Sequence, residues 1–155
     1  MTATRGLSLP AVLLLAAAAS GGDGILGGYA DHAGFLGQVA ELGRREGVEV
    51  RSLGRTRGGR DVLLLTISAG EADRKPALLV LGATHPPHLA GAELALRLAR
   101  RLAAPDPEAR RLVERATFYV IPRPSPDACE AFFTRPRVER AGNARATDDD
   151  RDGEV

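Results

Sequence analysis

The chain has 155 residues, which is enough for one domain with its own hydrophobic core. Its 21 Lys and Arg against 20 Asp and Glu give a formal net charge of +1, so composition offers no electrostatic argument for binding nucleic acid or a membrane surface. Cys129 is the single cysteine, which excludes an internal disulfide.

The first 20 residues predict a secretory signal peptide. Arg5 supplies a positive charge, an apolar run extends from Leu7 to Ala19, and small residues then provide a cleavage site. The run is shorter than the about 20 apolar residues that a membrane-spanning helix needs. We therefore expect residues 1–20 to be a cleaved signal peptide and residues 21–28 to be a flexible lead-in. The mature protein is then expected to be secreted or periplasmic, with no membrane association after cleavage.

The first elements of the mature chain are a helix and a strand pair. Asp31 is placed to cap a helix that stops at Gly47. Residues 48–53 and 62–67 have the pattern of two strands, and the turn-rich segment 54–60 between them predicts a hairpin. A continuous apolar run at 77–83 then predicts a strand that is buried on both faces.

In the second half of the chain, predicted helices alternate with predicted strands. A helix is predicted over about residues 89–103, with Leu94, Leu98 and Leu102 one turn apart, and Asp106 caps a second helix that ends near Glu114. Residues 117–121 form a third apolar strand, and regular structure is expected to fade after Pro122. The crossover spacing predicts an α/β fold: a mixed sheet, parallel at its centre, with flanking helices.

Two histidines follow the apolar strand at 77–83. His85 lies at its carboxyl end, where sites gather in open α/β sheets, and His88 comes where the next helix begins. A metal or a substrate is expected at such a position, and imidazole nitrogens are common metal ligands. Pro86 and Pro87 are expected to keep this segment extended over about 10 Å, which would hold the two rings apart. Two interpretations stay open: a metal-binding pair, or a structural His88 that caps the helix.

Several motifs in fixed order resemble the zinc carboxypeptidases of the carboxypeptidase A type. They are a Gly-Arg turn between two strands, a His-x-x-Glu-like segment, a Pro-x-x-Asn-Pro-Asp-Gly-like segment and an Asn/Arg motif, found here at residues 54–60, 85–88, 122–128 and 143–145. The likeness covers about residues 29–153. The chain departs from the family pattern at His88, which replaces a glutamate, and at Ser125 and Ala128, which replace Asn and Gly.

The resemblance implies a carboxypeptidase-like fold and a hydrolase that removes C-terminal residues from peptides, with zinc held by His85 and His88. Arg60, Asn143 and Arg145 match residues that bind the substrate, so the expected partners are peptide or protein C-termini. The family's third zinc ligand and its catalytic glutamate would fall after Val155. The resemblance therefore implies that residues 29–155 are the N-terminal part of a truncated peptidase-like domain and contain no catalytic base.

The resemblance also bears on the edge of the sheet and leaves a second function open. The family's sheet would continue past the chain, which would leave strand 77–83 or strand 117–121 at an open edge. The alternative function is that of a catalytically inactive carboxypeptidase-like binding module that has lost the metal site.

An acidic run near the end of the chain matches the opening of a calcium loop. Asp148, Asp150 and Asp152 alternate and are followed by Gly153, as in Asp-x-Asp-x-Asp-Gly. Carboxylate oxygens at alternate positions can surround one Ca²⁺, and a solvated acidic loop is the other interpretation. A calcium-stabilised structural domain without catalysis is a third candidate function.

Overall fold

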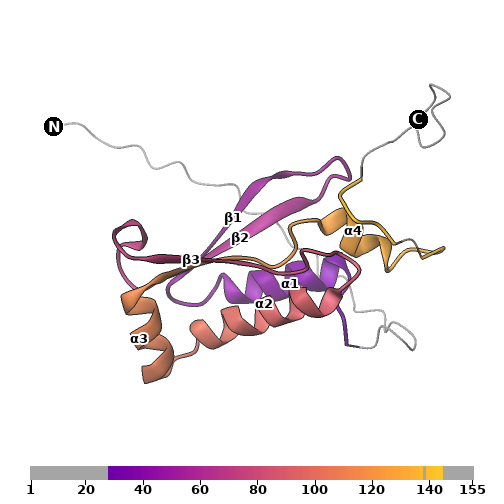
Figure 1. Cartoon of the computed structure of the whole chain (residues 1–155). Coiled ribbons are helices and arrows are strands. Elements are labelled where there is room, and N and C mark those ends of the chain that lie inside the picture. The colour runs from indigo at the N-terminus through magenta and orange to yellow at the C-terminus, as the bar shows by residue number, and fades with distance from the viewer. Residues whose placement is uncertain (1–27, 138, 145–155) are drawn as a thin grey trace.

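A four-stranded sheet organises the residues that this computed structural model describes, which are 28–137 and 139–144 (Figure 1). The strands are β1 (Val48–Arg55), β2 (Asp61–Ile67), β3 (Ala77–Leu81) and β4 (Thr117–Ile121), and their order in the sheet is β1-β2-β4-β3. β2 pairs antiparallel with both β1 and β4, whereas β3 runs parallel to β4. The predicted hairpin and the predicted mixed sheet are both confirmed.

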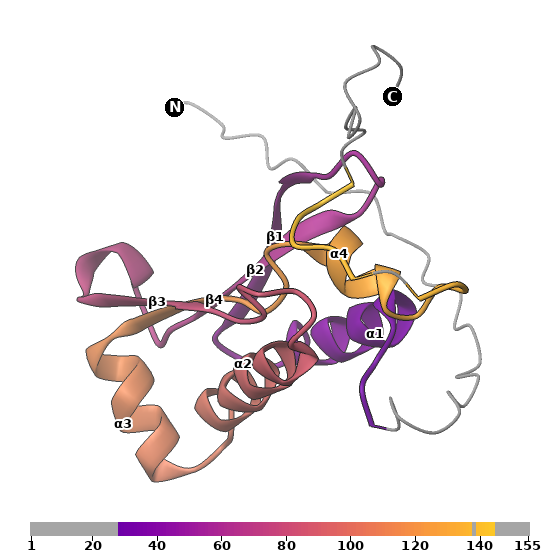
Figure 2. The same cartoon turned by 45° about the vertical axis from the view of Figure 1, so that its right-hand side comes forward.

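In the described part of the chain, four α-helices accompany the sheet: α1 (His32–Leu42), α2 (Leu89–Leu102), α3 (Pro107–Arg115) and α4 (Pro126–Ala131). A short 3₁₀ helix, η2 (Ala72–Arg74), precedes β3. Figures 1 and 2 show α1, α2 and α3 on one face of the sheet. None of the helices among the described residues is long and apolar enough to cross a membrane.

Side-chain caps fix where two of these helices begin. The Asp31 carboxylate accepts a hydrogen bond from the Gly34 N–H (2.8 Å), and the Asp106 carboxylate accepts from Glu108 and Ala109. Both caps were predicted, because Asp satisfies backbone N–H groups that a helix start leaves without partners. The first helix ends at Leu42 rather than at Gly47, and turns fill the interval to β1.

The hydrophobic core lies between the helices and the sheet. Its buried members include Phe35 and Leu42 of α1, Leu65 and Ile67 of β2, and Leu96 of α2. The buried stripe of α2 consists of Leu89, Ala92, Ala95, Leu96, Ala99 and Leu102. The prediction that Leu94 and Leu98 share the buried face with Leu102 is therefore wrong. Small alanines occupy that face, and the two leucines lie on its flank.

The placement of the two apolar strands differs from the expectation. β3 is an edge strand whose Leu78 and Leu79 are 50% and 62% exposed, so it is not buried on both faces. β4 lies between β2 and β3, so of the two strands proposed for an open edge only β3 occupies one. An apolar run reveals that a strand is fit for burial, but it does not reveal which elements cover it.

Regular structure also continues past Pro122, contrary to the prediction. The helix α4 begins with Pro126 at its first position and Asp127 in its first turn. Both residues are typical helix-start signals. The helix was not predicted because it has only 6 residues and lies in a stretch rich in Pro and Arg.

Candidate functional site

The two histidines that follow β3 lie in a closed turn. The His88 N–H donates to the His85 carbonyl (2.8 Å), with Pro86 and Pro87 at the centre of the turn. The expectation of an extended segment is therefore wrong: the fixed φ of proline also suits the first central position of a turn. The two imidazole rings are exposed, their centroids are 4.7 Å apart and their planes meet at 71°. The structure thus brings the predicted pair together.

Close backbone packing holds this turn between β3 and α2. A Cβ added to Gly82 would lie 2.5 Å from the Pro122 carbonyl oxygen, and one added to Gly91 would lie 2.7 Å from the Ala83 nitrogen. Only glycine allows such an approach. Pro86 is buried, and its carbonyl accepts a long hydrogen bond from the Cys129 thiol of α4 (3.8 Å). Sequence reasoning missed both glycines, although they flank the histidines at a strand-to-helix junction.

His88 occupies the N-cap position of α2. Its side chain makes no capping hydrogen bond, so the imidazole is free of that role. Two imidazole nitrogens are a donor set that zinc accepts, and they fit as part of a site. Within residues 28–137 and 139–144, no group of three or more His, Cys, Asp or Glu side chains could hold a metal ion.

A second polar cluster centres on Asp127, at the start of α4. Its side chain is 1% exposed and accepts four hydrogen bonds: from the Thr56 hydroxyl (2.9 Å), the Gly58 N–H (3.1 Å), the Arg60 guanidinium (3.1 Å) and the Ala144 N–H (2.9 Å). Burial raises the pKa of Asp127, but these four donors outweigh it and hold the pKa below its ordinary value.

The Asp127 carboxylate joins two segments that carry predicted substrate-binding residues. Arg60 bonds to Asp127 and to the Gly58 carbonyl through Nη1, and its side chain is 29% exposed. The Asn143 side-chain oxygen accepts from the Asp127 N–H (3.2 Å), and its nitrogen donates to the Pro124 carbonyl (3.4 Å). The structure thus gathers Arg60 and Asn143 around one buried carboxylate, whose role sequence reasoning missed.

Both clusters lie at the same end of the sheet. β3 and β4 run parallel with Leu81 opposite Ile121, so the histidine turn and the segment that leads to Asp127 leave the sheet side by side. Helix α4 connects the clusters directly, because it contains both Asp127 and the Cys129 that contacts the histidine turn. Burial raises the pKa of the Cys129 thiol, which suits a packing role.

Other predicted features lie outside the described residues. They are Arg145, the acidic residues Asp148, Asp150 and Asp152, the signal peptide, and the lead-in up to residue 27.

A buried arginine that the sequence did not indicate binds the segment that leads into α1. Arg123 is 2% exposed, and its guanidinium donates to the carbonyls of Ala30 (2.5 Å) and Asp31 (3.3 Å). It also lies 4.5 Å from the centre of the Phe35 ring. Burial lowers the pKa of Arg123, although the two carbonyls and the ring partly replace water around the charge. In a chain so rich in arginine, no pattern distinguishes this one.

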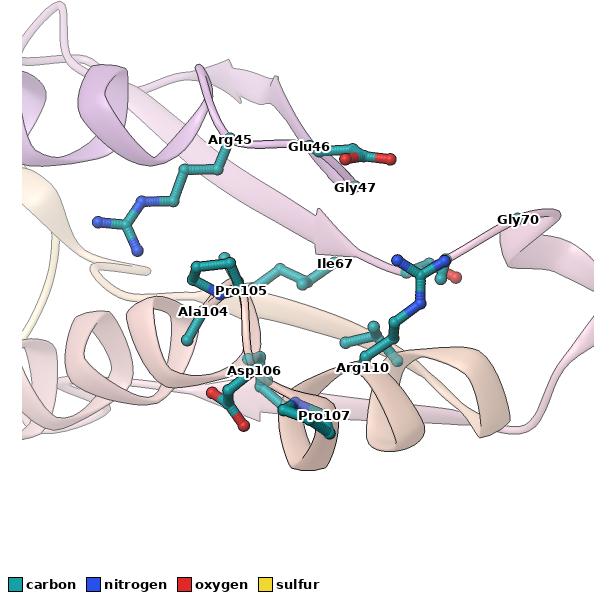
Figure 3. Close-up of a pocket in the computed structure, with 15 residues that line it drawn as sticks. Arg45, Glu46, Gly47, Ile67, Gly70, Ala104, Pro105, Asp106, Pro107 and Arg110 are labelled. Carbon is teal, nitrogen blue, oxygen red and sulfur yellow. The ribbon is translucent and has the colours of Figure 1, made fainter.

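A cleft of about 1100 Å³ lies elsewhere (Figure 3). It is lined by the end of β2 and by the junction of α2 and α3, which includes Ile67, Asp106 and Arg110. Because Ile67 pairs with Phe118 near the start of β4, the cleft is at the opposite end of the sheet from the histidines. Arg45 and Arg110, which line it, are paired with Glu41 and Glu114. We therefore place the candidate site at the histidine turn.

The fold and motifs agree with comparisons to solved structures. A metallocarboxypeptidase from Burkholderia cenocepacia is 35% identical, with a TM-score of 0.54 over 62% of this chain and 26% of that one. A metallocarboxypeptidase from Pseudomonas aeruginosa, in complex with (2-guanidinoethylmercapto)succinic acid, is 25% identical, with a TM-score of 0.53 over 65% of this chain and 27% of that one. Carboxypeptidase A from Helicoverpa armigera shares the fold at 20% identity, with a TM-score of 0.60 over 78% of this chain and 30% of that one.

The chain thus covers between about a quarter and a third of the length of these solved structures. Among proteins with curated functions, none matches it. The model of the zinc carboxypeptidase family matches residues 40–152, which include the histidine turn and the Asp127 cluster. The chain belongs to the zinc carboxypeptidase family.

Proposed function

We propose that this chain supplies the N-terminal part of an exported zinc metallocarboxypeptidase, a hydrolase that removes C-terminal residues from peptides. The observation that supports it best is the position of the His85 and His88 rings. They lie 4.7 Å apart at the sheet end where Asp127 gathers Arg60 and Asn143. Export would rest on the signal peptide, and N-terminal sequencing of secreted material should find a chain that begins near residue 21.

The two imidazoles would hold zinc as part of a ligand set that other residues complete. When bound, zinc supplies Lewis acidity at the carbonyl of the peptide bond to be cleaved. The glycine packing at Gly82 and Gly91 fixes the backbone on either side of the turn, so the two rings need little reorganisation to bind. His88 replaces the anionic ligand of the family by a neutral one, which leaves more positive charge at the site.

The Asp127 cluster would position the groups that receive the substrate. Among the described residues, Arg60 makes its hydrogen bonds through Nη1, which leaves Nη2 and Nε to pair with a carboxylate of the substrate. Both the oxygen and the nitrogen of the Asn143 side-chain amide are hydrogen-bonded, so its segment is fixed beside Arg60. We propose that Arg145, two residues later, contributes a second guanidinium for the terminal carboxylate.

An inactive binding module is the second candidate function. It is favoured by His88 at the position where the family has a glutamate. Such a module would keep the Asp127 cluster and bind peptide C-termini, but it would hold no zinc.

Zinc titration followed by calorimetry distinguishes the two candidates. The 155-residue chain should bind one zinc ion, and His85→Gln and His88→Gln should each weaken binding at least tenfold. His32→Gln is the matched control, because His32 is the third histidine of the chain and lies on α1. Its substitution should leave zinc affinity unchanged. Equal zinc binding by the wild type and both site variants would contradict the metal site and favour the inactive module.

A further inference from the structure

The start of α1 is held by two charged side chains, one just before α4 and one within it. The Arg123 guanidinium donates to the carbonyls of Ala30 (2.5 Å) and Asp31 (3.3 Å), the two residues that precede the helix. The Glu130 carboxylate accepts a hydrogen bond from the His32 N–H (2.7 Å), the first N–H of the helix. A cation thus binds the acceptors and an anion binds the donor of one short stretch of backbone. Arg123 and Glu130 together form what we term the α1 clamp.

The Glu130 contact completes a helix start that the local sequence leaves incomplete. Asp31 caps α1 through the Gly34 N–H, which is the third N–H of the helix. The first N–H groups of a helix have no partner inside it, so the His32 N–H needs an acceptor from elsewhere. Glu130 supplies that acceptor from 98 residues away in sequence. Its negative charge also suits the positive end of the helix dipole.

Burial makes the two charges of the α1 clamp depend on each other. Arg123 is 2% exposed, and its guanidinium lies 4.5 Å from the centre of the Phe35 ring in α1. Burial raises the pKa of Glu130, and the hydrogen bond from the His32 N–H opposes that rise. The positive charges of Arg60 and Arg123 oppose it as well. Glu130 therefore lies within the electrostatic reach of both guanidiniums, one in the clamp and one in the Asp127 cluster.

Helix α4 connects the α1 clamp to both clusters of the candidate site, and it packs beside α1 (Figures 1 and 2). Asp127 binds Arg60 of the hairpin loop, and Cys129 contacts Pro86 of the histidine turn. Glu130, on the same helix of 6 residues, holds the start of α1. Side chains within about two turns of one helix move together with its backbone. A shift of α4 away from α1 would therefore displace both clusters.

We propose that Arg123 and Glu130 are positioning residues, which hold α4 against the start of α1 and thereby fix the Asp127 cluster and the histidine turn for binding. This inference rests on the proposed function, because it assigns the clamp to the same site. The contacts of the clamp lie between residues 30 and 130, and the Arg123 side chain is already enclosed there. The clamp therefore does not depend on any later segment.

Amide hydrogen exchange in the 155-residue chain tests the connection without zinc. Glu130→Leu removes the acceptor and the charge, so α4 should loosen from α1. The Gly58 and Ala144 N–H groups, which donate to Asp127, should then exchange at least fivefold faster. The amides of β2, which pairs with a strand on each side, should keep the wild-type rate. A general loss of stability would instead accelerate the β2 amides as well, so the pattern separates positioning from stability alone.

Conservative variants and a control separate the clamp from an ordinary surface charge. Glu130→Gln keeps an acceptor for the His32 N–H and loses the charge, so its effect should be smaller than that of Glu130→Leu. Arg123→Met should give the same exchange pattern as Glu130→Leu, whereas Arg123→Lys keeps the charge and should recover part of the protection. Glu41→Leu is the matched control, because Glu41 pairs with Arg45 at the surface of α1. It should exchange as the wild type does.

Zinc titration adds a measurement at the histidine turn. Glu130→Leu should weaken zinc binding at least threefold, and Glu41→Leu should leave it unchanged. Circular dichroism checks that each variant folds, and Glu130→Gln gives the same comparison if Glu130→Leu does not fold. A wild type that binds no zinc would contradict the proposed metal site, while the exchange pattern would still decide the clamp. Unchanged exchange at Gly58 and Ala144 in the folded Glu130 variants, or an equal increase in β2, would overturn the inference.

Discussion

Asp127 is the residue on which most of the polar structure at the site depends. One carboxylate, almost fully buried, accepts hydrogen bonds from the hairpin loop at Thr56, Gly58 and Arg60 and from Ala144 at the far end of the described chain. These segments are more than 80 residues apart in sequence. The negative charge of Asp127 is therefore what holds the proposed substrate-binding residues in one place.

Removing this carboxylate should be costly. Asp127→Ala leaves the Arg60 guanidinium and three other donors without their acceptor, and we expect a loss of about 3–5 kcal/mol in the free energy of unfolding. Asp61→Ala removes a comparable ion pair at the surface, with Arg55, and should cost under about 1 kcal/mol. Urea denaturation of both variants measures the difference. Equal losses would show that the Asp127 cluster does not contribute as its burial implies.

The same carboxylate should make stability depend on pH. Because its pKa in the folded protein lies below the ordinary value of 3.8, the ionised form stabilises the fold, and this contribution is fully present above that value. It is lost as the pH falls below 3.8 and through the folded-state pKa. Asp127→Asn cannot titrate and should show a flatter dependence of the free energy of unfolding between about pH 4 and pH 2 than the wild type. If the free energy of unfolding depended on pH in the same way for both proteins, Asp127 would not be the source of this pH dependence.

At the scale of elements, the junction between β3 and α2 determines where the histidines lie. The backbone of α2 at Gly91 touches the backbone just after β3 at Ala83, and Gly82 in turn touches α2 at Ala95 and the Pro122 carbonyl that follows β4. Three elements meet there with no space for a side chain. The turn at residues 85–88 projects from this junction, so its position follows from backbone contacts.

A methyl group at Gly91 should therefore disturb both stability and metal binding. Its Cβ would lie 2.7 Å from the Ala83 nitrogen, and we expect Gly91→Ala to cost about 1–3 kcal/mol and to weaken zinc binding by displacing the turn. Gly37→Ala in α1 is the control, because its Cβ would meet nothing within 4 Å. That change should stabilise the protein by about 0.5–1 kcal/mol and leave zinc affinity unchanged. Urea denaturation and zinc titration measure both effects.

The elements themselves could be predicted from the sequence because their determinants are local. Caps at Asp31 and Asp106, the strand patterns of the hairpin and the crossover spacing all depend on residues close in the chain. The contacts of Asp127 with Thr56 and Ala144, and the exposure of β3, depend on residues far apart. The turn at His85 was mispredicted for a different reason: the same prolines that favour extended backbone also favour a turn, and the surrounding packing selects between them.

At the scale of the whole molecule, the two ends of the sheet have different characters. The carboxyl ends of β3 and β4 lead into the histidine turn and the Asp127 cluster, where polar groups from four segments gather. The opposite end holds the cleft, whose arginines are already paired with acidic neighbours. One sheet therefore supports the candidate chemistry at one end and, among the described residues, a cleft without an unpaired arginine at the other.

This organisation predicts that the 155-residue chain binds zinc but does not hydrolyse peptides. Catalytic zinc sites use three protein ligands and a general base. Among the described residues the histidine pair has no third ligand and no carboxylate placed beside it, and Asp127 is occupied by four donors.

Incubation of the zinc-loaded chain with a blocked dipeptide should therefore release no C-terminal amino acid above the rate in zinc buffer alone. The His85→Gln variant serves as the control for a contaminating peptidase, because it should match the wild type in this assay while binding zinc more weakly. Hydrolysis that a chelator stops and that His85→Gln abolishes would contradict the prediction. It would mean that the described residues are not the whole of the active site.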